Sequence, residues 1–166
     1  MDNNSTLRRI RYALAASDEQ MAALLALKGH TLTTQEVCSI MGRAEDEGTV
    51  ECSDALLSDF LDALIIDRRG PPKPGRSIVP TKTLTNNMIL KKLRIAMKLH
   101  ETDMLHIFAT GEHPLSRGEL TALFRKPEHK HYRECGDQIL RSFLRGLALQ
   151  LRAEERASKA ATPAQQ

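Results

Sequence analysis

The residues of this chain whose types could most readily support chemistry lie in a short motif, Glu-Cys-x-Asp, which occurs twice. The first copy spans residues 51–54 and the second spans residues 134–137. A thiol flanked by carboxylates could act as a nucleophile or as a metal ligand. An enzyme or metal protein using Cys135, Asp137 and His113 is therefore one hypothesis. The charged and thiol residues of the two copies are Glu51, Cys52, Asp54, Glu134, Cys135 and Asp137.

The spacing around both cysteines favours a structural role instead. Cys52 is followed by Leu56 at i+4 and by Phe60 at i+8, which predicts that the thiol shares the apolar face of a helix. The second copy repeats this spacing. Free cysteines commonly behave as small buried hydrophobic residues. The sequence also has no Cys-x-x-Cys and no His-x-x-x-His of the kind that binds zinc. We therefore expect no catalytic residue, metal or cofactor at the motif.

Both copies belong to a longer internal duplication. Residues 3–69 align without a gap with residues 86–152, and 19 of the 67 aligned pairs are identical. Between the two repeats, residues 70–85 contain four prolines and two glycines, which predicts an extended linker. Residues 153–166 are predicted to be a partly disordered tail that prolongs the last helix briefly before fraying by Pro163.

Each repeat is predicted to contain four helices and no strand, because no segment alternates between apolar and polar residues over a sustained length. Capping-box patterns at Ser17, Thr33 and Ser116 indicate helix starts. The Asn pair that opens each repeat is predicted to cap its first helix. Gly29 and Gly111 are predicted to end the second helices. The fold class is thus all-α, with two tandem four-helix repeats related by a pseudo-twofold axis. The second and third helices of each repeat are also compatible with a helix-turn-helix.

Two arginines at equivalent positions of the two repeats are each predicted to connect two helices of their own repeat. Arg11 lies between Leu7 and Leu14 on the apolar stripe of the first helix, and Arg94 is its counterpart in the second repeat. A partly buried guanidinium needs a carboxylate partner. We expect each arginine to pair with an acid of the Glu-Cys-x-Asp motif and so to join the first helix of its repeat to the fourth.

Charge is distributed unequally between the repeats. The whole chain has a net charge of +3, but residues 3–69 carry 7 Lys or Arg against 11 Asp or Glu, whereas residues 86–152 carry 12 against 7. No apolar run approaches the ~20 residues of a membrane span, and the N-terminus does not have the features of a signal peptide. The expected compartment is the cytoplasm, where the three cysteines stay reduced.

The basic second repeat favours binding of nucleic acid or another polyanion. Arg141 and Arg145 lie at i and i+4 on its fourth helix, where the first repeat has Ser58 and Asp62. A loop at residues 125–133 combines Lys and Arg with two His and a Tyr. The candidate nucleic-acid-binding residues are Lys91, Lys98, Arg117, Arg125, Lys126, Lys130, Arg141 and Arg145.

Several motifs of the second repeat together resemble a known family. They are Asn-Asn-x-x-Leu-Lys-Lys-Leu-Arg, Arg-Lys-Pro-x-His, Tyr-Arg-Glu-Cys-Gly-Asp and Phe-Leu-x-Gly-Leu. The sequence resembles the YehS-like family, small bacterial proteins with a tandemly repeated domain of unknown function. The first repeat matches less closely, with Gly-Arg-Ala at residues 42–44 where the second has Arg-Lys-Pro. The resemblance implies a bacterial cytoplasmic protein with two such domains, and it implies no activity and no site residues.

Two further hypotheses follow from these features. The first is a non-enzymatic binding or regulatory protein that acts on nucleic acid through its basic second repeat. The alternative is a protein-interaction adaptor or homo-oligomer, in which acidic and basic repeats engage each other within or between chains.

Overall fold

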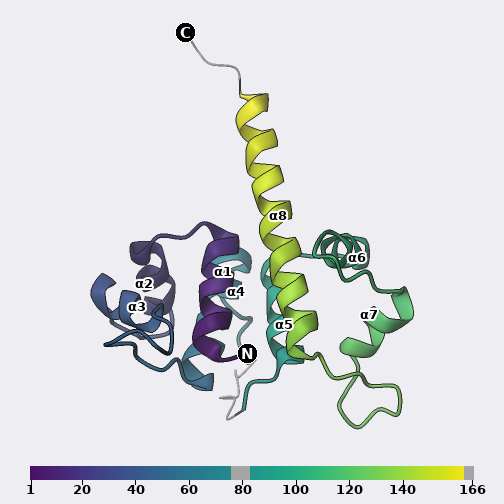
Figure 1. Ribbon diagram of the computed structural model, residues 1–166, viewed down its shortest axis with the longest axis horizontal. Coiled ribbons are helices and arrows are strands. Elements are labelled where there is room, and N and C mark those ends of the chain that lie inside the picture. The colour runs from purple at the N-terminus through teal and green to yellow at the C-terminus, as the bar shows by residue number, and fades with distance from the viewer. Residues whose placement is uncertain (76–82, 163–166) are drawn as a thin grey trace.

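The computed structural model describes residues 1–75 and 83–162, and it confirms the all-α fold class (Figure 1). The described residues form eight helices and no strand, four helices in each repeat. The helices are α1 (Asn3–Leu14), α2 (Asp18–Ala26), α3 (Thr34–Ile40), α4 (Asp54–Arg69), α5 (Asn86–Ala96), α6 (Glu101–Thr110), α7 (Arg117–Leu123) and α8 (Asp137–Ala161).

Side-chain caps begin several helices where the sequence predicts them. A complete capping box forms at Ser17, Thr33 and Ser116. The hydroxyl of each residue accepts a hydrogen bond from the backbone N–H three residues later, and the Gln or Glu side chain at that later position accepts one from the backbone N–H of the cap residue. The predicted cap of the first helices is wrong. Asp2 caps α1 and Thr85 caps α5, so the Asn pairs lie inside the first turn, where their side chains are directed to other segments.

The second helices of the two repeats end differently. Gly29 has a φ of +83°, which confirms its predicted role in the left-handed position after α2. Gly111 directly follows α6, which confirms the prediction that it ends this helix, but its φ is −77° and Glu112 takes the left-handed conformation at a φ of +64°. The absence of a side chain at Gly111 instead allows α6 to approach the backbone of α8 at Ser142.

The first helix of each repeat packs mainly against the last helix of the other repeat. In Figure 1, α1 lies beside α8, and α5 lies beside α4 on the far side of the body. The apolar stripes of all four helices are buried in one core, which includes Leu7 of α1 and Leu90 of α5. Burying each such side chain contributes about 1.5–3 kcal/mol, so the exchanged packing is a large part of the stability.

The last helix continues beyond Arg152, as the sequence predicts, and it includes most of the tail. α8 continues to Ala161, and it leaves the body of the molecule as a single helix (Figure 1). Residues 153–162 are exposed, and a Glu155–Lys159 ion pair at i, i+4 supports the helix there. The fraying predicted at Pro163 and the extended conformation predicted for residues 76–82 lie outside the described residues. Among the helices that the structure describes, none has the length and hydrophobicity needed to cross a membrane.

Candidate anion-binding groove

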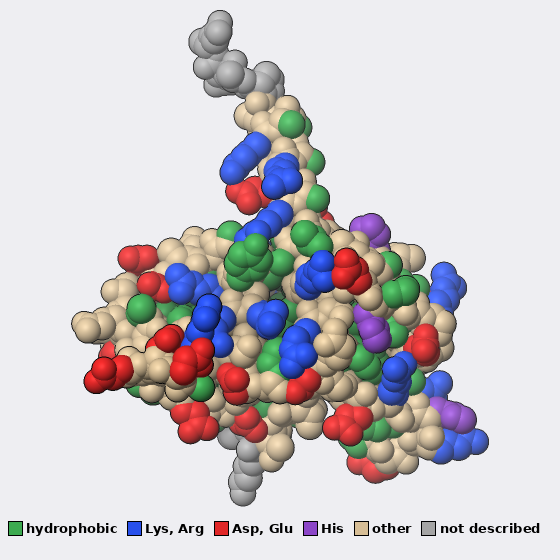
Figure 2. Space-filling view, in the orientation of Figure 1, with side chains coloured by type: hydrophobic (Ala, Val, Ile, Leu, Met, Phe, Trp, Pro, Cys, Tyr) green, Lys and Arg blue, Asp and Glu red, His purple; other side chains and the backbone are tan. Residues whose placement is uncertain are grey.

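A groove of about 850 Å³ lies between α1 of the first repeat and α8 of the second. Lys and Arg side chains gather on this face in the space-filling view, with hydrophobic side chains between them (Figure 2). One carboxylate, that of Glu112, is among the lining residues. Six arginines line the groove, three from each repeat, and they are Arg8, Arg9, Arg43, Arg141, Arg145 and Arg152.

Helical periodicity brings these side chains to one surface. On α1, Arg8, Arg9 and Tyr12 face the groove, whereas Leu7 and Ile10 of the same helix are buried in the core. On α8, the lining positions recur every three or four residues from residue 138 to residue 152, which is one face of a 3.6-residue helix. The two walls of the groove are therefore the outward faces of two helices that bury their other faces against the core.

Local contacts orient some of the groove arginines without neutralising their charge. Arg8 donates to the backbone oxygens of Gly42 and Met41. Arg141 donates to the Gln138 side chain at 3.2 Å.

Two further arginines have other partners. Arg145 pairs with the exposed Glu112 at 2.6 Å, and the guanidinium of Arg152 lies 3.7 Å from the centre of the Tyr12 ring. Arg9 makes no hydrogen bond or ion pair with any residue that the structure describes. The groove thus keeps an excess of positive charge that the described part of the protein does not compensate.

The duplication provides an internal comparison for this arrangement. At the equivalent place between α5 and α4, Lys92 occupies the position of Arg9, and it donates to Ser58 at 3.2 Å and forms an ion pair with Asp62. Ser58 and Asp62 are buried. Their counterparts on α8 are Arg141 and Arg145. The cation that Asp62 neutralises on one side of the molecule thus corresponds to Arg9 on the other, where the positions of Ser58 and Asp62 are taken by arginines, one of which is paired with Glu112.

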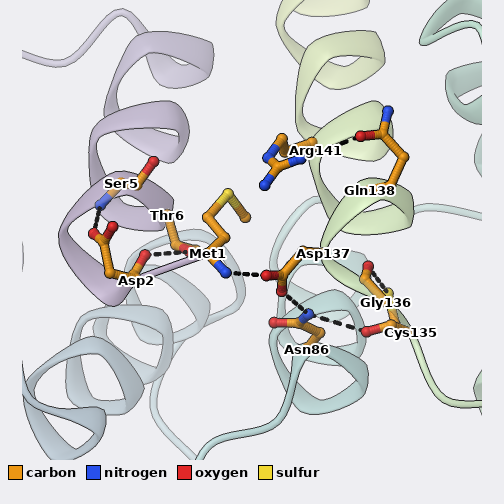
Figure 3. A network of polar contacts seen from close by, with 10 residues as sticks. All are labelled: Met1, Asp2, Ser5, Thr6, Asn86, Cys135, Gly136, Asp137, Gln138 and Arg141. Carbon is orange, nitrogen blue, oxygen red and sulfur yellow. Dashed lines mark hydrogen bonds and ion pairs between the residues drawn. The ribbon is translucent and has the colours of Figure 1, made fainter.

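The Glu-Cys-x-Asp motif connects the starts of helices (Figure 3). Asp137 accepts a hydrogen bond from the Asn86 side chain at 2.9 Å, and it pairs with the α-amino group of Met1. In the first repeat, Asp54 accepts hydrogen bonds from Asn3 at 2.7 Å and from the backbone N–H of Leu84 at 2.9 Å. Each Asp thus binds an Asn of its own repeat and a backbone nitrogen from the segment before the other repeat's first helix.

These hydrogen bonds stabilise the ionised carboxylates. The N–H of Leu84, followed by the Asn3 side chain, holds the pKa of Asp54 below its ordinary value of 3.8. The α-amino group of Met1, followed by the Asn86 side chain, does the same for the pKa of Asp137. Both residues therefore act as charged acceptors that join the two repeats.

The predicted pairing of Arg11 and Arg94 with these acids is wrong. Arg11 forms an ion pair with Asp18 at 2.9 Å and donates to the backbone oxygen of Ala16. Arg94 donates to the backbone oxygen of Leu99 and lies over the Phe124 ring at 4.7 Å. The physical reason is position along the helix. Asn3 at the start of α1 contacts Asp54, whereas Arg11 lies in the last turn of α1, beside Ala16 and Asp18.

The motif cysteines are buried, as their apolar neighbours predict, although they precede α4 and α8 rather than lying on them. Cys52 and Cys135 are each 2% exposed. Burial, assisted by the neighbouring acids, raises the pKa of the Cys52 thiol to about 12, and burial raises the pKa of the Cys135 thiol to about 12 as well. Both thiols are therefore protonated at neutral pH and are poor nucleophiles. Among the described residues no three His, Cys, Asp or Glu side chains are grouped as metal ligands.

Of the eight candidate nucleic-acid-binding residues, two line the groove, and they are Arg141 and Arg145. Lys91 lies on α5 and does not line the groove. Lys98 follows the end of α5 with a φ of +54°, and it does not line the groove either. Whether these lysines contact a ligand stays a prediction.

The remaining candidates lie on or beside α7. Arg117 pairs with Glu101 at 3.1 Å, and Arg125 contacts the His129 ring at 3.1 Å. Lys126 and Lys130 are exposed in the loop before α8. None of these side chains lines the groove, and their predicted contact with nucleic acid, like the helix-turn-helix, stays a prediction.

Sequence reasoning missed the groove residues of the first repeat. Arg8, Arg9 and Tyr12 share one helical face, and this spacing was a usable signal. The signal was obscured because the first repeat is acidic as a whole. Arg43 and Arg152 could not be found in this way, because their place in the groove depends on the packing of α1 against α8.

Comparison with known proteins supplies a family and a relative. A family model described as "Protein of unknown function (DUF1456)" matches residues 3–70 and again residues 86–153. The chain is similar to "Uncharacterized protein YehS" of Escherichia coli (strain K12), with 40% identity over 148 residues, which are 89% of this chain and 95% of the relative. No solved structure matches the chain.

Proposed function

This chain belongs to the DUF1456 family of proteins of unknown function, and we propose from its groove that it is a non-enzymatic protein that binds nucleic acid. The predicted resemblance to the YehS-like family is confirmed. Neither the family's description nor the relative's name states an activity. The proposal therefore rests on the chemistry of the groove between α1 and α8.

The observation that carries the proposal is the replacement of a neutralised pair by arginines. Lys92, Ser58 and Asp62 compensate one another between α5 and α4. The equivalent residues between α1 and α8 are three cations, Arg9, Arg141 and Arg145, and among the described residues only Arg145 of the three has a carboxylate partner, Glu112. Such a group of like charges costs folding free energy unless an anion neutralises it. Guanidinium groups bind phosphate oxygens through two parallel hydrogen bonds, so phosphate is a well-matched anion.

The spacing of the arginines favours a chain of phosphates over a single anion. Arg141 and Arg145 are one helical turn apart, a rise of about 6 Å, and Arg152 follows about 10 Å further along α8. Arg8 and Arg9 face them from the other wall. A row of cations on two walls suits a polyanion with regularly repeated charges, and nucleic acid is the common intracellular polymer of this kind.

The proposal is tested by giving the groove the sequence of its counterpart. The double substitution Arg141→Ser and Arg145→Asp reproduces Ser58 and Asp62 opposite Arg9. We expect the variant to fold normally and to bind a labelled mixed-sequence oligonucleotide roughly 100-fold more weakly in fluorescence anisotropy, because two charge-assisted contacts of ~1.5 kcal/mol each are lost.

The matched control is Lys91→Ser with Lys98→Asp, which makes the same change of charge outside the groove. We expect this control to retain wild-type affinity. Equal weakening by both variants would show that only the total charge matters, and absence of oligonucleotide binding by the wild type would reject the proposal. A partner that co-purifies with the wild type and survives nuclease treatment would instead support the protein-adaptor alternative.

A further inference from the structure

We infer that Tyr12 and Arg152 form a stacking platform for a nucleobase, and that the ligand of the groove is therefore single-stranded. This inference rests on the proposed function and deepens it. Single strands are bound by basic grooves that follow the backbone and by aromatic rings on which bases stack. The groove between α1 and α8 provides both elements.

The first supporting observation is the exposure of Tyr12. Its side chain is 59% exposed and lines the groove, whereas Phe60, Phe108 and Phe143 are fully buried. Tyr12 is outside the hydrophobic core that the described residues form. Core packing therefore does not account for an aromatic ring at this position.

The second observation is that the ring is held in place. The guanidinium of Arg152 lies over it at 3.7 Å from its centre, and Arg152 also donates a hydrogen bond to the Tyr12 hydroxyl. A cation over one side of the ring restricts its rotation and leaves most of the side chain accessible. A ring that is already oriented loses little conformational entropy when a base stacks on it.

The neighbours of Tyr12 extend the platform. Leu149 lines the groove one turn before Arg152 and is 48% exposed, so an apolar surface continues beside the ring. Arg8 and Arg9 lie one turn away on α1, where they can bind the phosphates that flank a stacked base. The residue equivalent to Tyr12 in the second repeat is Ile95, which follows Lys92 of the neutralised Lys92–Asp62 pair by three residues on α5. Of these two equivalent positions, the one that lines the arginine-rich groove thus has the aromatic ring.

This geometry distinguishes single strands from duplexes. In a duplex the base faces are stacked on one another, so a groove of this kind meets only the backbone. In a single strand the base faces are free, and stacking on an aromatic ring adds to affinity with little dependence on sequence. We therefore expect a preference for single-stranded nucleic acid that depends on Tyr12 and on the presence of bases.

Intrinsic fluorescence provides a direct test, because the chain has two tyrosines and no tryptophan. In a Tyr132→Phe background, Tyr12 is the sole emitter. We expect a single-stranded oligonucleotide to quench its fluorescence, and an abasic oligonucleotide of equal length to leave it unchanged. Anisotropy measurements should show about 10-fold tighter binding of the normal strand than of the abasic strand.

Two variants complete the experiment. Tyr12→Phe should retain the preference for bases, and Tyr12→Leu should remove it while thermal unfolding stays unchanged, because the residue is exposed. Equal, salt-dependent binding of normal, abasic and duplex probes would overturn the stacking inference and leave the backbone groove in place. No binding of any of these probes would overturn the proposed function and the stacking inference with it.

Discussion

Asn4 and Asn87 are buried polar side chains that fasten the loops of their repeats to the first helices. The Asn4 amide nitrogen donates to the backbone oxygens of Ile40 and Val50 at 2.8 Å each, and its oxygen accepts from the N–H of Cys52 at 2.9 Å. Asn87 makes the equivalent three hydrogen bonds. A helix cap needs only one such bond, so the retained Asn is explained by this three-way connection.

We predict that Asn4→Ala and Asn87→Ala each lower the free energy of unfolding by about 3 kcal/mol. Each change removes three hydrogen bonds of about 1 kcal/mol and leaves buried backbone groups unpaired. Denaturant unfolding followed by circular dichroism measures the effect. The exposed Thr102→Ala serves as control, with an expected change within about 0.5 kcal/mol. A loss similar to the control would contradict the structural role of these amides.

At the scale of elements, α6 approaches α8 closely because two glycines face each other. A Cβ atom added at Gly146 would lie 1.9 Å from the backbone oxygen of Ile107, and one added at Gly111 would lie 1.9 Å from that of Ser142. These are backbone atoms, so rotation of a side chain cannot relieve the overlap. In the first repeat the aligned residues are Lys28 and Ala63, so this pair of facing glycines belongs to the second repeat alone.

We predict that Gly146→Ala destabilises the protein by about 1–3 kcal/mol, because the two helices must separate to admit one methyl group. Gly118→Ala in α7 is the matched control, since its Cβ would meet nothing nearer than the Ser116 hydroxyl at 4.0 Å. That change should stabilise the protein by about 0.5–1 kcal/mol through helix propensity. Thermal unfolding of both variants tests the opposite signs, and two changes of equal sign would contradict the close approach.

At the scale of the whole molecule, the exchange of helix partners creates two different faces from one duplicated unit. Lys92 and Asp62 neutralise each other between α5 and α4. Between α1 and α8, three arginines of the acidic repeat meet three of the basic repeat. The two faces thus differ more in charge than the two repeats do. The larger difference is between the helix pair α1 and α8 and the helix pair α4 and α5.

The groove predicts a characteristic salt dependence. If all six arginines contact phosphates of a single strand, the logarithm of the binding constant should fall with the logarithm of salt concentration at a slope of about −4. Arg9→Gln should reduce the magnitude of this slope by about 0.7, because one fewer counterion is released. Lys91→Gln on α5 should leave the slope unchanged. Anisotropy titrations over a range of salt concentrations measure all three slopes, and equal slopes for the two variants would contradict the groove.

The sequence by itself determined the duplication, the number of helices and most of their starts. Capping boxes at Ser17, Thr33 and Ser116 are local interactions, so their patterns are visible without a partner. The burial of Cys52 and Cys135 was also predicted, but the predicted helical position was wrong, because both cysteines precede their helices. Arg141 and Arg145 were identified as differences between the repeats, because the aligned Ser58 and Asp62 are not cations.

Only the tertiary structure decided which helix packs on which. The Arg–carboxylate pairing was predicted wrongly because Asn3 and Asn86, at the starts of the first helices, contact the acids, and the arginines lie near the other ends of those helices. The packing of α1 against α8 depends on the summed burial of apolar faces that are far apart in the chain, and local sequence patterns do not reveal this sum. The same packing places Arg8, Arg9 and Tyr12 of α1 in one groove with Arg145 and Arg152 of α8. The candidate site was therefore absent from either repeat alone and arose where the two repeats meet.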